Sequence, residues 1–436
     1  MKICSKKDIK VMTGIMAASL LLGGCTSNVK KEEKKKVELK GDPNVRTEID
    51  LKKVSDTEYD QKVMDEQYRR YCFDLLKQTI TDNQTNSNVM ISPASIMMAL
   101  DMAAAGAKGD SLKQLTDLFA PGQGPLSQQA YAAALMDKIN KAENVEFSCA
   151  NAAWANRSLL GDNVNLEYVD YITKTFKAEY TLADFDDKTP DQINKWVDKN
   201  TDHMIKKLVD KLSDETVMVL VNAIAFEGKW ADPYDESQIM EGGFTNYDGS
   251  TKTVKFLHCG SDNYYESDKA VGFMKAYKGN KYAFLTILPK DEKANANEFA
   301  KSFTAEDYEK FIKSVSGDYL VVTQMPEFKS EFEAGMSDTL INMGCKDIFS
   351  KEAADLSGIA GKKGDLYVSK VLHKTFIEVN ATGTKAAAAT AVMVDVAGAE
   401  PVTKEIRKVI CDRPYVYAIV DTETMSPIFV GTVNEL

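Results

Sequence analysis

The chain has 436 residues, of which 44% are hydrophobic and 27% are charged. This composition excludes disordered, fibrous and many-span membrane proteins, and the length is sufficient to bury a sizeable core. Because 65 acidic residues outnumber 54 lysines and arginines, the formal net charge is −11. A chain with this balance has no general electrostatic attraction for nucleic acid, so no nucleic-acid partner is expected.

The first 24 residues have the layout of a secretory signal. An uncharged run from Val11 to Gly24 follows a lysine-rich start, and it is too short to span a membrane after processing. The run ends in Leu21-Leu22-Gly23-Gly24-Cys25, which is similar to a bacterial lipobox. We therefore predict a lipoprotein signal peptide over residues 1–24 and lipidation of Cys25; the alternative is a plain signal peptide and a chance cysteine. The mature protein is expected to be exported and lipid-anchored to the bacterial cell envelope, at the surface or the outer membrane.

Residues 25–58 are predicted to form a charged, flexible tether. They show no apolar periodicity, and Lys30 to Lys40 reads KKEEKKKVELK. Such mixed-charge segments bury too little apolar surface to become ordered. A basic stretch beside a lipidated cysteine could also contact anionic headgroups, but the interspersed glutamates favour a solvated spacer.

Two helices are predicted next. Apolar residues recur at helical spacing between Val63 and Ile80, with polar residues between them. In Ser92-Pro93, serine suits a helix N-cap and proline the first helical position. The helix that follows, from Ala94 to about Ala107, is rich in Met, Ala and Leu, so we expect it to be largely buried.

Strands dominate the second half of the chain. A strand is predicted from Val145 to Trp154, and Thr189-Pro190 begins another helix. The almost uninterrupted β-favouring run from Val217 to Phe226 is typical of a strand covered on both faces. Further strands are predicted over 283–288, 319–324, 367–379, 415–421 and 428–433. With no βαβ alternation and no repeat, this order predicts an α+β fold built on large, mainly antiparallel sheets.

The chain carries no catalytic, metal or cofactor motif. Its three histidines, His203, His258 and His373, belong to no H-E-x-x-H sequence, and neither G-x-S-x-G nor a Walker A sequence occurs. Five cysteines remain besides Cys4 and Cys25, an odd number without a C-x-x-C pair, so neither a disulfide framework nor a zinc site is expected. The sequence therefore gives no evidence for an enzyme and implies no cofactor.

The most informative segment lies between two predicted strands, from Asn380 to about Val402. Loops of this length inside compact domains are usually functional or disordered. The stretch from Gly383 to Thr390 consists mainly of small residues, and the residues that follow favour a strand. Small side chains would allow the segment to slide between two existing strands, so the loop could convert into a central strand.

Several separated stretches resemble the serpin family. The segment from Gly383 to Thr390 is one, and Val221 to Trp230 (VNAIAFEGKW) is a very close match. The others are ISPASI at 91–96, NAAW at 151–154, INKWV at 193–197, MPEF at 325–328, ADLSGI at 354–359, VLHK at 371–374 and SPIFVG at 426–431. From their order and spacing, the chain is identified as a member of this family.

The resemblance implies one serpin domain over residues 59–436. It would contain three mainly antiparallel β-sheets, surrounding helices and an exposed reactive-centre loop at about residues 381–402. In this family a protease cleaves the loop and forms an acyl-enzyme, and the cleaved loop inserts into the largest sheet. The attached protease is distorted, so deacylation stalls. Because the protease supplies the nucleophile and the oxyanion hole, the inhibitor itself is not an enzyme.

The resemblance also assigns candidate site residues. The hinge of the loop comprises Gly383, Thr384, Lys385, Ala386, Ala387, Ala388, Ala389 and Thr390. The shutter, where polar groups lie under the opening strands, comprises Ser92, Ser95, Asn222 and His373. The alternative for these four is a capping serine and ordinary satisfied core polar groups. Trp230 matches the tryptophan of the breach at the top of the sheet, and its alternative is an ordinary core aromatic.

The family's usual spacing from Gly383 predicts cleavage between Ala397 and Gly398. A small residue there suits a protease with a shallow apolar pocket, so an elastase-like serine protease is the expected target. Val396, Ala399 and the basic site at Lys404 are alternatives, and cysteine proteases with a broad apolar preference are a second target class.

Two features depart from the family pattern. Ala381 stands where an acidic residue is common and Glu327 where its partner is commonly basic, so the usual breach ion pair is absent. A partly exposed pair contributes only about 0–1 kcal/mol, so this loss does not argue strongly against function. Lys385 replaces a common glutamate, and after insertion its side chain is expected to face solvent.

We interpret the chain as a monomeric suicide-substrate inhibitor of serine endopeptidases that forms a covalent complex with its target and is attached to a membrane through the Cys25 lipid. The alternative is a non-inhibitory serpin-fold binding or carrier lipoprotein, although such proteins usually have prolines, charges or bulky groups in the hinge. A solute-binding lipoprotein should show βαβ lobes, and an envelope hydrolase should show a reactive serine or cysteine motif. Neither pattern is present in the sequence.

Overall fold

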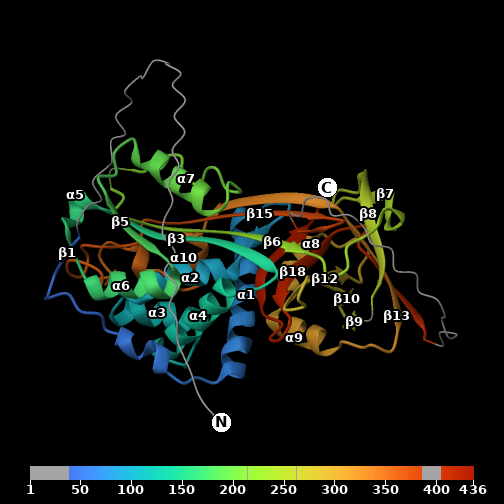
Figure 1. Cartoon of the computed structure of the whole chain (residues 1–436), viewed down its shortest axis with the longest axis horizontal. Helices are drawn as coiled ribbons and strands as arrows, with labels where there is room; N and C mark the ends of the chain where they lie inside the picture. Colours follow the sequence, from blue (N-terminus) through green and yellow to red (C-terminus); the bar gives the residue numbers. More distant parts are fainter. Residues whose placement is uncertain (1–38, 214, 262, 385–403) are drawn as a thin grey trace, which may run out of the picture. The chain divides into compact units, whose positions relative to one another are not determined.

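The computed structural model describes residues 39–436 except for residues 214, 262 and 385–403 (Figure 1). The described chain contains helices and several sheets, so the predicted α+β class is confirmed. Its helices are α1 (Gln61–Asn83), α2 (Pro93–Ala104), α3 (Gly109–Phe119), α4 (Pro125–Asn140), α5 (Arg157–Leu160), α6 (Leu166–Phe176), α7 (Thr189–Asn200), α8 (Ala296–Ser302), α9 (Ala305–Lys313) and α10 (Ser337–Asn342). Short 3-10 helices are η1 (Leu51–Asp56), η2 (Glu236–Gln238) and η3 (Asp347–Phe349). Within the described part, no helix combines the length and apolar character needed to cross a membrane.

The main sheet has the strand order β14-β15-β16-β6-β3-β5. These strands are β14 (Phe328–Gly335), β15 (Lys370–Asn380), β16 (Gly383–Thr384), β6 (Met218–Lys229), β3 (Val145–Asn156) and β5 (Glu179–Ala183). Each strand predicted in this region is present, although β15 begins later than the predicted position 367. The pairs β15–β6 and β3–β5 are parallel, and the other pairs in this sheet are antiparallel.

Two further sheets of more than two strands belong to the described part of the domain. The first has the order β2-β19-β18-β12-β10-β9, with β11 paired to β12. Its strands are β2 (Met90–Ile91), β19 (Pro427–Val433), β18 (Tyr415–Asp421), β12 (Tyr282–Pro289), β10 (Ala270–Gly272), β9 (Tyr265–Glu266) and β11 (Met274–Ala276). The second has the order β17-β13-β8-β7, from β17 (Ile406–Ile410), β13 (Leu320–Pro326), β8 (Thr251–Ser261) and β7 (Ile239–Thr245).

Helix α2 begins as its sequence predicts. The Ser92 side chain accepts a hydrogen bond from the backbone N–H of Ser95, and Pro93 occupies the first turn. Every residue of α2 is buried, because the helix contacts β6 and β3 as well as the neighbouring helices α3 and α4. The helix ends at Ala104, before the predicted end at Ala107.

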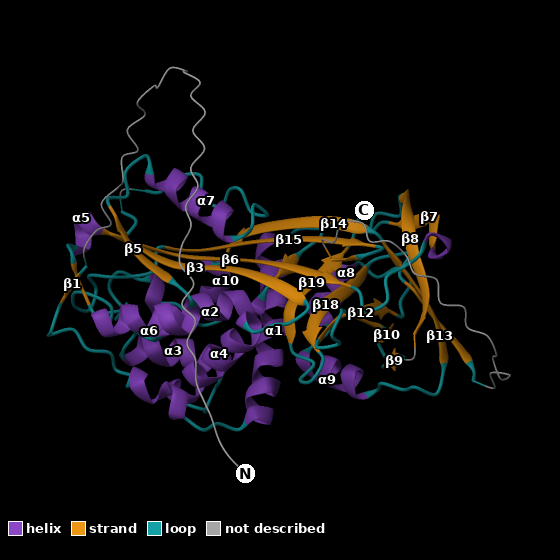
Figure 2. Ribbon diagram, in the orientation of Figure 1, coloured by secondary structure: helices purple, strands orange, loops and turns teal. Residues whose placement is uncertain are grey.

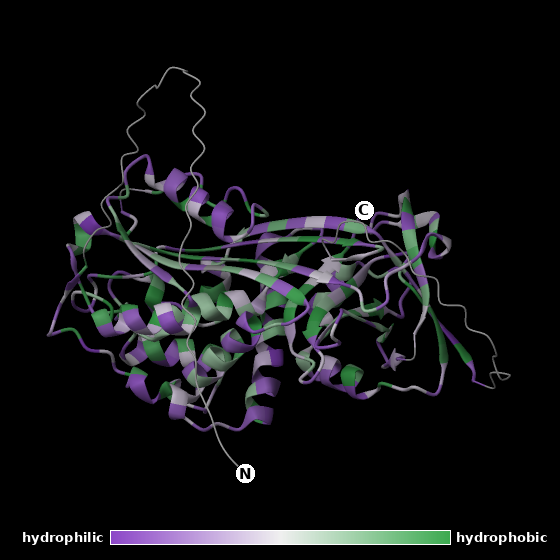
Figure 3. Cartoon of the chain, viewed as in Figure 1, coloured by the Kyte–Doolittle hydropathy of each residue, from purple (hydrophilic) through white to green (hydrophobic). Residues whose placement is uncertain are grey.

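Strand β6 is covered on both faces, as its continuous apolar run predicts. Leu220, Ile224 and Phe226 belong to the large core that includes α1 and α2. Val219 and Val221 pack in a second cluster with residues of α7. Figure 2 shows α7 on one side of the main sheet and α1 to α4 on the other, and Figure 3 shows that α7 is hydrophilic on its outer side. The main sheet is therefore the central layer of this half of the domain.

Residues 39–58 form an ordered N-terminal strap, so the predicted flexible tether is wrong for this part. Strand β1 (Lys40–Gly41) pairs in parallel with β4 (Asn163–Val164), and η1 contacts α4. Ile49, Leu51 and Val54 are buried in the main core. The prediction failed because charged residues dominate the segment, whereas Leu51 and Val54, one 3-10 turn apart, supply enough apolar surface to fix it. Residues 1–24, Cys25 and the rest of the tether to residue 38 lie outside the described residues.

The strap predicts a measurable cost of truncating Leu51. The Leu51→Ala substitution removes a side chain that is 5% exposed, so we expect the free energy of unfolding to fall by about 2–5 kcal/mol. Urea denaturation followed by circular dichroism measures the difference. The control is Ser55→Ala on the exposed side of η1, with an expected change within about 0.5 kcal/mol. Equal effects of the two substitutions would contradict the docked strap.

Candidate functional site

Strands β15 and β6, in the middle of the main sheet, are paired along only part of their length. Residues 370–374 of β15 pair in parallel with residues 219–223 of β6. Farther along, residues 375–378 pair only with β14, and residues 224–227 pair only with β3, among the described parts of the chain. The facing edges of these two stretches form a gap in the hydrogen bonding of the sheet, which we call the slot.

The start of the predicted hinge occupies one end of the slot. Gly383 and Thr384 form β16, which pairs in antiparallel fashion with Asn380 and Val379 of β15. On its other side β16 pairs with residues 228–229 of β6. The hinge therefore already begins as a strand between β15 and β6.

Gly383 is required by the close approach of β6. A Cβ atom at this position would lie 2.1 Å from the carbonyl oxygen of Gly228 and 2.7 Å from the Cα of Lys229. Real Cβ atoms do not approach backbone atoms this closely, so a larger residue would push β16 out of the sheet. Thr384, the next residue, is fully buried, and its hydroxyl lies 2.7 Å from the hydroxyl of Tyr277.

The turn that leads from β15 into the hinge is held by backbone and side-chain hydrogen bonds. The Trp230 indole N–H donates to the carbonyl of Asn380 at 2.9 Å, and its backbone N–H donates to the carbonyl of Thr382 at 3.0 Å. The carboxylate of Glu327 accepts a hydrogen bond from the backbone N–H of Ala381 at 3.0 Å. Charged acceptors make stronger hydrogen bonds than neutral ones, so Glu327 fixes the turn without the ion pair common in this family.

Trp230 also has the burial of a core residue, since it is 1% exposed. Its ring stacks on Tyr277 with 4.7 Å between centroids and 12° between planes. Tyr277 in turn contacts Thr384 of the hinge. Trp230 therefore packs in the core and also contacts the base of the predicted hinge; its breach role stays a prediction.

Where β15 and β6 are paired, three of the four predicted shutter residues are linked by hydrogen bonds. The backbone N–H of Ser92 donates to Nε2 of His373 at 3.0 Å, and the Ser92 hydroxyl donates to the carbonyl of Ile428 at 2.8 Å. The backbone N–H of Ser95 donates to the Ser92 hydroxyl. The N-cap of α2 is therefore tied directly to β15.

The fourth predicted residue, Asn222, belongs to a polar row across the sheet. Asn151 of β3, Asn222 of β6 and His373 of β15 are register partners on adjacent strands. The Asn222 amide donates to the side-chain oxygen of Asn151, and the Asn151 amide donates to the carbonyl of Phe176 at 2.8 Å. We call Asn151, Asn222 and His373 the polar row.

Two buried atoms of the polar row are unsatisfied among the described residues. Nδ1 of His373 and Oδ1 of Asn222 are buried, and neither has a hydrogen-bond partner among the described residues. Because Nε2 accepts from Ser92, the neutral ring carries its proton on Nδ1. A buried donor and a buried acceptor that make no hydrogen bond destabilise the folded protein. A small movement of the two strands would change this cost by bringing the atoms into or out of hydrogen-bond distance. Burial also lowers the pKa of His373 to about 3.

The sequence missed several residues of this region. Asn151 lies within the NAAW stretch and could have been found by the same register argument as Asn222. Tyr277 and Asn380 carry no sequence signal for their contacts with the hinge, because the contacts arise between distant elements. Hinge residues 385–390 and the predicted bond Ala397–Gly398 lie outside the described residues.

Comparison with known proteins identifies the family. Residues 66–436 match the family described as Serpin (serine protease inhibitor). An uncharacterized serpin-like protein of the archaeon Methanosarcina mazei is 30% identical over 433 residues, which cover 98% of this chain and 97% of that protein. The chain therefore belongs to the serpin family, whose members are generally protease inhibitors rather than enzymes.

Solved structures agree with this assignment. The thermophilic serpin Tengpin in its native state is 34% identical and superposes with a TM-score of 0.79, covering 87% of this chain and 96% of that one. A thyroxine-binding globulin complex with thyroxine shares the fold, with a TM-score of 0.73 and 23% identity over 85% of this chain and 99% of that one. The fold therefore also occurs in a protein that carries a small ligand.

The low pKa of His373 predicts a pH dependence of stability. An unfolded histidine binds a proton near pH 6.5, whereas the folded His373 does so near pH 3. The contribution of neutral His373 to the free energy of unfolding is therefore fully present above pH 6.5. It is lost as the pH falls toward 3, by up to about 1.4 kcal/mol per pH unit. Urea unfolding at neutral pH and near pH 5 should differ by about 2 kcal/mol more in the wild type than in His373→Gln. The control His203→Gln changes an exposed ring and should keep the wild-type difference; equal pH dependence in all three proteins would contradict the assignment.

Proposed function

We propose that the protein is a suicide-substrate inhibitor of serine endopeptidases that traps its target by inserting the cleaved loop into the main sheet. The slot carries this proposal. Among the described residues, its edges on β15 and β6 lack strand partners, and β16 already starts a strand between them. An inserted strand would complete the hydrogen bonding of both edges, which supplies the free energy that inhibition by this route needs.

The hinge sequence suits the slot residue by residue. If β16 continues in its present register, Ala386 comes between Ile377 and Phe226, and Ala388 comes between Thr375 and Ile224. These positions share the inward face with Thr384, because side chains alternate along a strand. Alanine can enter this buried layer without displacing its neighbours, which favours the inhibitor over the carrier alternative.

The outward side of the same register offers a partner for Lys385. Continuing the pairing of β16 places Lys385 between Glu378 of β15 and Glu227 of β6. Before insertion Glu378 is paired with Lys329 at 3.1 Å, whereas Glu227 is opposite another carboxylate, Glu146. A lysine between the two glutamates would offset their repulsion. The lysine that departs from the family's usual glutamate thus fits the charges of this particular sheet.

The chemistry would belong to the protease. Its catalytic serine oxygen attacks the carbonyl carbon of Ala397, the bond to Gly398 breaks, and the protease base delivers a proton to the departing Gly398 amine. The remaining ester stays intact because insertion distorts the protease before water can attack. A small residue at position 397 favours elastase-like enzymes, and broad-specificity cysteine proteases are a second target class.

The second candidate function is a non-inhibitory binding or carrier protein. The thyroxine-binding globulin relative shows that this fold is compatible with carriage of a small ligand. The alanine-rich hinge sequence and the edges of β15 and β6 that lack a described strand partner argue for the inhibitor, because a pure carrier has no need of an insertable loop.

We propose further that the protein is exported and held at the bacterial cell envelope by a lipid on Cys25, as a monomer. The support is the signal-like sequence of residues 1–24. Mass spectrometry of the membrane fraction should find a lipidated N-terminal cysteine, and Cys25→Ser should release the protein from the membrane. A mature N-terminus at another residue would contradict this assignment.

The inhibitor proposal predicts a covalent complex. Incubation with an elastase-like serine protease should give a denaturant-resistant complex on a gel and release a C-terminal fragment that begins at Gly398. A fragment with a different start would move the reactive bond. If proteases of several specificities only cut the loop, stay active, and leave the melting temperature of the cut protein unchanged, the inhibitor proposal fails and the carrier alternative remains.

The buried position of Thr384 predicts a variant that is a substrate rather than an inhibitor. Thr384→Arg would place a charge in a fully buried site, so insertion should be blocked. We expect cleavage by the protease at a normal rate and at least a tenfold loss of complex on the gel. Lys385→Arg, which keeps an outward charge, is the matched control and should form complex as the wild type does.

Charge exchange tests the register of the inserted strand. Lys385→Glu should reduce the rise in melting temperature that follows loop cleavage, because three carboxylates would then be adjacent; each cross-strand pair is worth about 0.2–1 kcal/mol. The double variant Lys385→Glu with Glu227→Lys should recover the rise. Absence of recovery, with both proteins folded, would contradict the register.

A further inference from the structure

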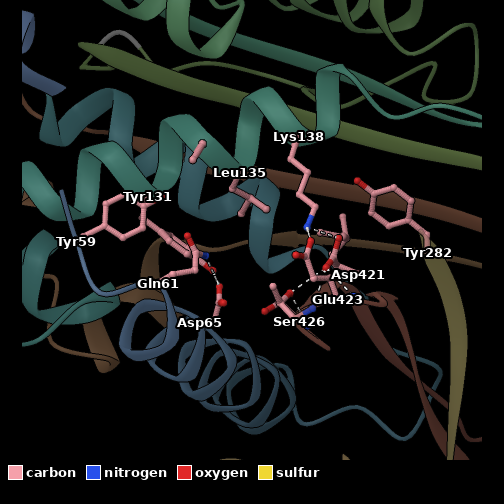
Figure 4. A pocket seen from close by; sticks show the side chains of 13 residues that line it. Tyr59, Gln61, Asp65, Tyr131, Leu135, Lys138, Tyr282, Asp421, Glu423 and Ser426 are labelled. Atoms are coloured by element: carbon pink, nitrogen blue, oxygen red, sulfur yellow. Dashed lines mark hydrogen bonds and ion pairs between the residues drawn. The ribbon is translucent and has the colours of Figure 1, made fainter. Parts of the chain in front are cut away.

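A cavity on the helical side of the domain has the features of a ligand site. It has a volume of about 250 Å³ and lies between α1, α4 and the strands β12, β18 and β19. Figure 4 shows two groups of polar side chains separated by Leu135. Tyr59, Gln61, Asp65 and Tyr131 form the first group, and Lys138, Tyr282, Asp421, Glu423 and Ser426 form the second. The cavity is thus apolar in the middle and polar at both ends.

Asp65 is a carboxylate without a cation. Its side chain belongs to a residue that is 8% exposed, and its Oδ1 accepts hydrogen bonds from the Tyr131 hydroxyl at 2.9 Å and the Gln61 amide at 3.0 Å. No lysine or arginine of the described chain lies within ion-pair distance of it. Arg69, one helical turn farther along α1, is instead bound to Glu309 and to the carbonyl of Thr424. Burial raises the pKa of the Asp65 carboxyl, and Arg69 and Lys138 offset this only from a distance, because both are bonded to other carboxylates. Buried charges are normally paired, so Asp65 lacks a direct cationic partner.

The other end of the cavity also favours a positive ligand. Lys138 Nζ lies 2.7 Å from Asp421 and 3.2 Å from Glu423. Together with Asp65, three carboxylates therefore line the cavity against one ammonium group. The net charge of the described lining is negative, so an anionic ligand is disfavoured.

Ser426 supplies a second independent indication. The residue is 2% exposed, and its hydroxyl is buried without a hydrogen-bond partner in the described part of the protein. Ser426 lines the cavity from the turn between β18 and β19. Seven other hydroxyls of the described chain are also buried without a partner, so Ser426 is an indication because it lines the cavity. Rotation of its side chain would bring the hydroxyl to a polar group of a ligand, which would satisfy it.

The tyrosines define the body of the ligand. Tyr59 and Tyr131 meet edge to face with 5.9 Å between centroids, and Tyr282 lies at the other end of the cavity. Tyrosine rings bind aromatic groups and also attract ammonium ions to their faces. Sites for drug-sized molecules have volumes of about 300–1,000 Å³. The volume of this cavity is smaller, so the ligand must be small.

We propose that this cavity binds a small arylalkylamine, with its ammonium group beside Asp65, its ring among the tyrosines and a polar ring substituent at Ser426. The ammonium supplies the missing partner of the buried carboxylate, and a phenolic hydroxyl supplies the missing partner of Ser426. Bound ligand would connect α1 and α4 with the β18–β19 turn and raise the melting temperature of the protein. This proposal does not depend on the inhibitory function.

Tyramine is the probe, and calorimetric titration of the purified protein at neutral pH and low salt is the measurement. Two relatives of tyramine test its two ends. Tyrosol has a hydroxyl in place of the ammonium group, and phenethylamine lacks the phenolic hydroxyl but keeps the ring. We expect tyrosol to bind at least tenfold more weakly than tyramine. Equal affinity of tyramine and tyrosol, or no binding of tyramine at millimolar concentration to the folded protein, would overturn the proposal.

Variants locate the site. Asp65→Asn should weaken tyramine at least tenfold and leave tyrosol unchanged, whereas Glu66→Gln, on the exposed side of α1, should alter neither. Ser426→Ala should weaken tyramine but not phenethylamine. If Asp65→Asn does not fold, the Ser426→Ala comparison and the three ligands on the wild type decide. Unchanged tyramine affinity in folded Asp65→Asn, or in Ser426→Ala, would overturn the assignment of that end of the ligand.

Discussion

Strands β15 and β6 are bonded to each other over residues 370–374 and 219–223, and beyond these residues no described segment lies between their facing edges until β16. Much of the molecule is arranged around this incomplete pairing. Buried backbone groups without partners are costly, so the strand insertion that we propose would release free energy by completing the hydrogen bonds of both edges. The two residues of β16 show where such a strand enters: Gly383 fits against the backbone of β6, and Thr384 fills a buried site beside Tyr277.

Buried polar groups lie where the two strands meet. The polar row of Asn151, Asn222 and His373 crosses the sheet just where the paired part of β15 and β6 ends, and it is tied to α2 through Ser92. An apolar row would hold the strands together more firmly, since it has no unsatisfied atoms. The row instead leaves Nδ1 of His373 and Oδ1 of Asn222 without hydrogen-bond partners among the described residues, so these side chains contribute few hydrogen bonds between the two strands. Near the hinge the opposite holds, because Trp230 and Glu327 fix the turn with strong hydrogen bonds.

Carboxylates play different parts in the two regions considered as sites. Glu227 and Glu378 are half-exposed on the outer face of the main sheet, where water and salt weaken their effect, so they tune the insertion of a strand without deciding it. Asp65 lies in a cavity between helices and strands, where burial raises the pKa of its carboxyl group, while the hydrogen bonds from Tyr131 and Gln61 act in the opposite direction. A carboxylate on the surface of the sheet therefore changes the free energy of strand insertion only slightly, whereas the buried carboxylate of Asp65 would select for the ammonium group of the proposed ligand.

The sequence alone determined the family, the α+β class, the capped and buried helix α2 and the two-sided burial of β6, because short-range patterns and separated motifs carry that information. The hinge and shutter assignments stay predictions that rest on the family resemblance. It did not reveal the hairpin of β7 and β8, the docking of the strap through Leu51 and Val54, or the role of Glu327 as an acceptor for Ala381. It also gave no sign of the cavity, whose lining comes from α1, α4, β12 and the β18–β19 turn. These features depend on which distant residues come within a few ångströms of each other. Only the tertiary structure decides such contacts, because the register of strands and the packing of helices place side chains that no local pattern connects.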